Sequence, residues 1–129
     1  TAPLIYCNVA RQAAENHLPA QLDQLHKIQE EFRAANAEGD AEAASFLNHG
    51  FHQQMGLMAR NPYLLVALNR MLIDHTRLSQ TFYRPCSEDG TRRVESSVAQ
   101  HDAMLEAMAR RDGDSMVALT MDHWNLTRD

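Results

Sequence analysis

At 129 residues the chain has the length of one ordinary domain, enough to bury a single hydrophobic core. Its hydrophobic content of 44% and charged content of 22% are those of a globular protein, and no apolar run approaches the roughly 20 residues that cross a bilayer. With 12 Lys and Arg residues against 17 Asp and Glu the net charge is -5, and the basic residues are scattered. We therefore expect no membrane span, and no DNA binding by this chain alone.

Two further features indicate the setting of the chain. Cys7 and Cys86 form no CxxC pair, which favours free thiols in a reducing cytoplasm over a disulfide framework. The sequence begins at Thr1 with no signal-peptide pattern and enters a helical pattern almost at once, so we expect that an upstream part of the protein has been removed.

Proline, glycine and capping residues divide the sequence into six helix-length segments without strand-like alternation. We predict helices from Pro3 to Asn16, from Pro19 to a stop at Gly39, from the N-cap Asp40 to about Ala59, from Pro62 through Phe82, from about Thr91 to Arg111, and from about Ser115 to Leu126. Short connections favour antiparallel packing, so the expected fold is an all-α antiparallel bundle of about six helices with a central cavity.

Helical phase separates the seven histidines of the chain. His101 falls in the middle of the apolar stripe of the fifth helix, and His123 shares an apolar face of the sixth. On the third helix Asn48 and His52 are four residues apart, so their side chains lie one turn apart on one side. These four residues are therefore the candidates to point inward.

The inward histidines have two interpretations. A lone histidine on an apolar face is more often a core residue with one satisfied hydrogen bond than a ligand. Three on different helices are costly to bury unless a shared partner satisfies them, and a divalent metal such as zinc, nickel, copper, cobalt or iron is such a partner. Phase alone leaves both interpretations open.

The remaining histidines differ in position. His17 lies near a helix end, and His26 and His49 flank their apolar stripes, so we expect these three on the surface. His75 is in phase with the apolar residues of the fourth helix, and periodicity does not exclude it from the site.

Three motifs, in order along the chain, are similar to those of one known family. Asn48-His49-Gly50-Phe51-His52 is followed by a helix break at Asn61-Pro62; the stretch from His101 to Met108 is followed by Gly113-Asp114; and His123 lies on the last helix. The first helix, with Ala13-Ala14, adds to the likeness, although Tyr6 stands where the family usually has Glu. On these motifs nearly the whole chain resembles the FCD domain, the C-terminal effector-binding domain of FadR-type GntR transcription regulators.

The resemblance implies a metal site made of Asn48, His52, His101 and His123, with His75 in the wall of the cavity. Zinc is the expected metal, with nickel or manganese as alternatives. Asn48 replaces the commoner Asp, which leaves the metal its full double charge and increases its attraction for an anion.

The resemblance also implies the partners. We expect a homodimer whose missing N-terminal winged helix-turn-helix domain binds DNA, and a small carboxylate effector that binds beside the metal. Arg77 is our candidate to hold the other end of the effector together with His75; its alternative interpretation is a surface arginine paired with Asp74. The sequence does not rank the other arginines that could contact the effector, which are Arg70, Arg92 and Arg93.

The competing function is enzymatic. Three histidines with an open metal position also describe a small helical metalloenzyme that activates water. No Asp or Glu lies within a turn of His52 or His123 on the inward face as a general base. We therefore expect a ligand-sensing domain of a cytoplasmic regulator and no enzyme.

Overall fold

The computed structural model describes residues 2–127, apart from the side chains of Arg77 and Leu78. Over these residues the chain forms six helices and no strand: α1 (Ala2–Asn16), α2 (Pro19–Ala37), α3 (Ala41–Met58), α4 (Pro62–Phe82), α5 (Glu88–Ala109) and α6 (Gly113–Thr127). The predicted all-α class is therefore confirmed.

Side-chain caps begin α3 and α4, and the cap at Asp40 was predicted. The side chain of Asp40 accepts a hydrogen bond from the backbone N–H of Ala43 at 3.1 Å and begins α3. The side chain of Asn61 accepts from Tyr63 and Leu64 at 3.1 and 3.3 Å, and Pro62 follows it as the first residue of α4. These caps satisfy N–H groups that a helix start leaves without a partner.

Helices α5 and α6 begin earlier than predicted, because a side chain caps each of them before the predicted start. Ser87 Oγ accepts from the backbone of Gly90 at 3.0 Å, so α5 begins about one turn before the predicted Thr91. Asp112 accepts from the backbone of Ser115 at 3.0 Å, so α6 already begins at Gly113.

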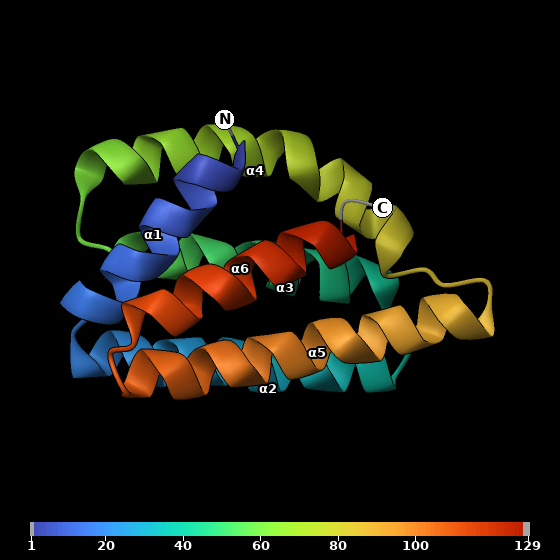
Figure 1. The fold of residues 1–129 in the computed structure, drawn as a ribbon. Helices are drawn as coiled ribbons and strands as arrows, with labels where there is room; N and C mark the ends of the chain where they lie inside the picture. The colour runs from blue at the N-terminus through green and yellow to red at the C-terminus, as the bar shows by residue number, and fades with distance from the viewer. Residues whose placement is uncertain (1, 128–129) are drawn as a thin grey trace.

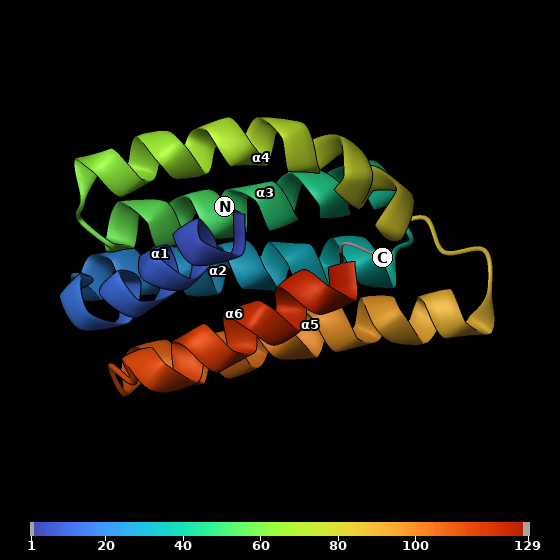
Figure 2. The same ribbon diagram turned by 45° about the horizontal axis from the view of Figure 1, so that its top comes forward.

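The helices form two layers. Helices α4, α3, α2 and α5 lie side by side in that order, and α1 and α6 cross in front of them (Figures 1 and 2). Helix α1 contacts α3, α4 and α6, while α6 also packs on α5. The space between the layers is therefore enclosed by helices from both halves of the sequence.

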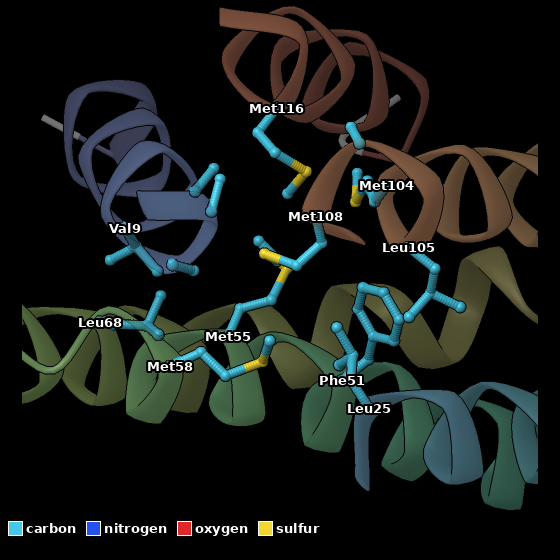
Figure 3. Close-up of a cluster of buried hydrophobic side chains, with 14 of the residues drawn as sticks. Val9, Leu25, Phe51, Met55, Met58, Leu68, Met104, Leu105, Met108 and Met116 are labelled. Carbon is cyan, nitrogen blue, oxygen red and sulfur yellow. The ribbon is translucent and has the colours of Figure 1, made fainter. Parts of the chain in front are cut away.

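A core rich in methionine fills one part of this space. Side chains from all six helices meet there, among them Val9, Leu25, Phe51, Met55, Leu68, Met108 and Met116 (Figure 3). Gly56 lets α4 approach closely, because a Cβ on this residue would lie 2.6 Å from Leu68 Cδ2. Within the described residues, no helix is long and apolar enough to cross a membrane.

Candidate metal centre

Three histidines from three helices converge between the layers. His52 comes from α3, His101 from α5 and His123 from α6, and each offers a ring nitrogen within 4.8 Å of the other two. The ring centroids are 5.5 Å apart for His52 and His101, 5.1 Å for His52 and His123, and 4.8 Å for His101 and His123. The structure thus brings together the three histidines that helical phase selected.

Hydrogen bonds orient two of these rings. Nδ1 of His101 donates to Gln29 Oε1 at 3.0 Å, and Nδ1 of His123 donates to Gln100 Oε1 at 2.8 Å. In both rings Nε2 is buried and has no hydrogen-bond partner. Each ring is therefore held at one nitrogen, and its other nitrogen has no partner within the protein.

Asn48 completes the candidate ligand set. It lies one turn before His52 on α3, and its Oδ1 is also buried and without a hydrogen-bond partner. A buried polar atom with no partner costs about 1–3 kcal/mol, so several at one place indicate a missing shared partner. Imidazole nitrogens with one amide oxygen form a donor set that suits a divalent first-row metal, and the residues present therefore fit such an ion.

Burial keeps the three imidazoles neutral. Burial, with the nearby His49 as the smaller cause, lowers the pKa of His52 to about 4. Burial also brings the pKa of His101 and that of His123 well below the ordinary value, with repulsion between the site imidazoles as the smaller cause. Neutral imidazole is the form that binds a metal, so at neutral pH these rings are ready to act as ligands.

A cavity of about 90 Å³ lies beside the candidate ligands. It is several times larger than the roughly 10–15 Å³ that one water molecule needs. Its walls come from α1, α3, α4 and α6, and they consist of Tyr6, Asn48, His49, His52, Leu72, His75, Thr76, Ser79, Thr120, His123, Trp124 and Thr127. Since Asn48, His52 and His123 belong to this wall, an ion at the site would be open to a ligand in the cavity.

An aromatic group forms one side of the cavity. Tyr6, His75 and Trp124 lie with ring centroids 5.1 to 5.9 Å apart, and the Tyr6 hydroxyl is 2.7 Å from Nδ1 of His75. His75 is not among the three converging histidines and lies in the wall. The side chain of Arg77, our candidate for the effector, lies outside the described residues.

Two surface predictions are wrong. His17 is buried, because its ring folds back on α1 and Nδ1 donates to the carbonyl of Ala13 at 2.8 Å. His49 is half-buried in the cavity wall, where Nδ1 donates to Thr76 Oγ1 at 2.7 Å. His26 is exposed, as predicted.

Three polar residues of the site were not predicted from the sequence: Gln29, Gln100 and Thr120. Thr120 is buried, lines the cavity and has no hydrogen-bond partner for Oγ1. A signal for two of the three residues was present. Gln29 falls between Leu25 and Phe32 on the apolar stripe of α2, and Thr120 lies one turn before His123.

The chain is an all-helical two-layer bundle with a histidine-lined cavity, and comparison with known proteins identifies its family. The sequence profile of the FCD domain matches residues 4–126, so the chain belongs to the FCD domain family. This confirms the resemblance that the motifs indicated.

A solved structure is similar in fold. The E. coli protein McbR/YncC superposes with a TM-score of 0.82 at 15% sequence identity, and the alignment covers 95% of this chain and 57% of that chain. This chain therefore spans little more than half the length of that protein. A comparison with the curated proteins found no match.

Proposed function

We propose that this domain senses a small carboxylate through a divalent metal held by Asn48, His52, His101 and His123. The observation that carries the proposal is the convergence of three neutral imidazoles from three helices, with two buried Nε2 atoms and Asn48 Oδ1 left without partners. A metal supplies a Lewis-acidic centre with a position open to the cavity. The protein supplies the ligands, their orientation and the shape of the pocket.

Zinc is the proposed metal. A site with three nitrogen ligands favours zinc or nickel over manganese, which prefers oxygen. All four proposed ligands are uncharged, so the metal keeps its double positive charge. That charge attracts an anionic effector, and among the described residues that line the cavity there is no Lys or Arg to do so.

The effector is expected to contact the cavity wall beside the metal. His75 and Tyr6 are hydrogen-bonded to each other there, and the Thr120 hydroxyl is free to bond a ligand. We also propose Arg77 as a second contact for the effector.

We further propose that this chain is the effector-binding regulatory domain of a GntR-family transcription regulator. Two properties of that full protein complete the proposal. A winged helix-turn-helix domain outside this chain binds DNA, and the regulator is a homodimer. Effector binding changes the geometry of the DNA-binding dimer. The dimer is supported by the outer face of α4, where Tyr63, Val66 and Ile73 are 88%, 64% and 73% exposed. Exposed apolar side chains on one helix face are typical of a surface that binds a partner.

The metalloenzyme alternative lacks support in the cavity. None of the described residues that line it is Asp or Glu, so no carboxylate is placed to act as a general base beside the metal. We therefore propose binding without turnover.

A thermal-shift screen of small carboxylates tests the function. Zinc-loaded protein and protein treated with a chelator are compared, because a ligand that binds only the folded state raises the melting temperature. The proposal expects a carboxylate that stabilises the zinc-loaded protein and has no effect after chelation. Stabilisation that is equal with and without metal would contradict it.

A further inference from the structure

Two of the converging imidazoles share one hydrogen-bonding arrangement. In His101 and in His123 the Nδ1 atom faces a glutamine side-chain oxygen, at 3.0 Å from Gln29 Oε1 and 2.8 Å from Gln100 Oε1. In both rings the Nε2 atom is buried and without a partner. The two glutamines come from different helices, α2 and α5.

The contacts of Gln29 fix the direction of its amide. Gln29 is fully buried, and its Nε2 donates to the carbonyl of Val98 at 3.0 Å and to Asp102 Oδ1 at 3.1 Å. Both partners are acceptors, so the amide nitrogen must face them and the amide oxygen must face His101. That oxygen only accepts, and therefore the proton of His101 must be on Nδ1.

We propose that Gln29 and Gln100 are positioning residues that hold His101 and His123 in the Nδ1–H tautomer. The lone pair of each ring is then on Nε2, the atom that has no partner within the protein. This inference rests on the proposed function where it concerns metal binding. The tautomers themselves are properties of the metal-free protein.

A surface ion pair supports the inner glutamine. Asp102, which accepts from Gln29, also pairs with the guanidinium of Arg33 on α2. The Arg33 and Asp102 side chains are half-exposed, whereas Gln29 and His101 are fully buried. A continuous path thus leads from the surface through Asp102 and Gln29 to His101, and each step along it fixes the orientation of the next group.

Metal-free protein labelled with ¹⁵N provides the direct test. Long-range ¹H–¹⁵N NMR spectra distinguish a protonated ring nitrogen from one that carries a lone pair. In the parent protein, His101 and His123 are expected to be protonated at Nδ1 only. The Nε2–H tautomer at His101 in the parent would overturn the proposal for Gln29, whatever the variants do.

Methionine substitutions remove each acceptor at nearly constant side-chain size. Gln29→Met is expected to convert His101 to a mixture of tautomers and leave His123 unchanged, and Gln100→Met is expected to do the reverse. Gln100→Glu keeps an acceptor and is expected to keep the Nδ1–H form of His123. Gln24→Met, on the exposed side of α2, is the matched control and changes neither ring.

Zinc titration by calorimetry supplies the second measurement. Removing an outer partner of a metal-bound histidine typically weakens metal binding by about 10- to 100-fold, and we expect this loss in Gln29→Met and Gln100→Met. Gln100→Glu is expected to bind zinc at least as well as the parent. Nδ1–H tautomers that persist in both methionine variants, with parental zinc affinity, would overturn the proposal.

The two measurements separate this inference from the proposed function. If the glutamine substitutions change the tautomers but the parent binds no zinc, the proposed metal site is wrong and the positioning role of the glutamines stands. If the parent binds zinc and the glutamine substitutions leave both tautomers unchanged, the positioning role is wrong. If Gln29→Met does not fold, the spectrum of the parent and the measurements on the Gln100 variants still test the proposal, because Gln100 is only half-buried.

Discussion

The rings of Phe51 and His101 stack face to face, with centroids 3.9 Å apart and planes only 6° from parallel. Phe32 contacts the same imidazole with its centroid at 4.7 Å. These contacts keep water away from His101 and fix the plane in which its ring lies. The apolar core and the candidate ligand are therefore parts of one packed unit.

Replacing Phe51 should damage stability and the site together. Phe51 is fully buried, and a Phe→Ala change in a core costs about 3–5 kcal/mol of unfolding free energy. We expect Phe51→Ala to lose about this amount in urea denaturation. Phe46→Ala is the control on the same helix, because Phe46 is 73% exposed and its loss should stay within about 0.5 kcal/mol. Similar costs for the two variants would contradict the packing described here.

Acid should destabilise the metal-free protein. The folded-state pKa of His52 is about 4, against an ordinary value of 6.5, and those of His101 and His123 are also lowered. Between these values the unfolded chain binds protons that the folded chain does not, so unfolding free energy falls as the pH falls from 6.5 towards 4. Melting temperatures measured with chelator across this range test the sign. His52→Gln should flatten the dependence, and His26→Gln, at an exposed position, should leave it unchanged.

Asn48→Asp tests the electrostatics of the proposed centre in two opposite directions. A carboxylate in place of the amide is expected to tighten zinc binding, because an anionic ligand joins three neutral ones. The same change removes one unit of positive charge from the centre, so a carboxylate effector should bind less tightly. Calorimetric titrations of metal and effector measure both effects. A variant in which both affinities rise would contradict the charge argument.

Thr120→Val tests the contribution of the cavity wall to effector binding. The two side chains have nearly the same shape, and Thr120 Oγ1 has no partner within the protein, so the folded state and zinc content should be unaffected. If the hydroxyl bonds the effector, the carboxylate found in the screen should bind about 5- to 10-fold more weakly, a loss of about 1–1.5 kcal/mol. Unchanged effector affinity would exclude this contact.

Helical phase predicted the fold and the three converging histidines, because an inward position depends mainly on the period of the helix. His52, His101 and His123 each share a face with apolar neighbours, and the structure buries His101 and His123 and places His52 against the cavity. The cap at Ser87 was missed because serine also occurs in ordinary turns, and a cap is distinguished from a turn only by its hydrogen bond.

The polar surroundings of the site were not predicted, because they depend on contacts between distant helices. Gln29 bonds to His101 from 72 residues away, and Gln100 bonds to His123 from 23 residues away. His17 was assigned to the surface because it lies near a helix end, and His49 because it flanks an apolar stripe. The ring of His17 instead folds back onto its own helix, and His49 faces α4. Periodicity describes one helix at a time and carries no information on which helix lies opposite.

Zinc titration of four histidine variants tests the central claim most directly. His52→Ala, His101→Ala and His123→Ala each remove one proposed ligand, and His75→Ala removes a neighbouring imidazole from the cavity wall. We predict that the parent binds one zinc ion per chain, that each of the first three variants loses more than the roughly 10- to 100-fold typical of outer partners, and that His75→Ala keeps its affinity within a few-fold. A parent protein that takes up no divalent metal, or His101→Ala and His123→Ala variants that bind zinc as well as the parent does, would contradict the account.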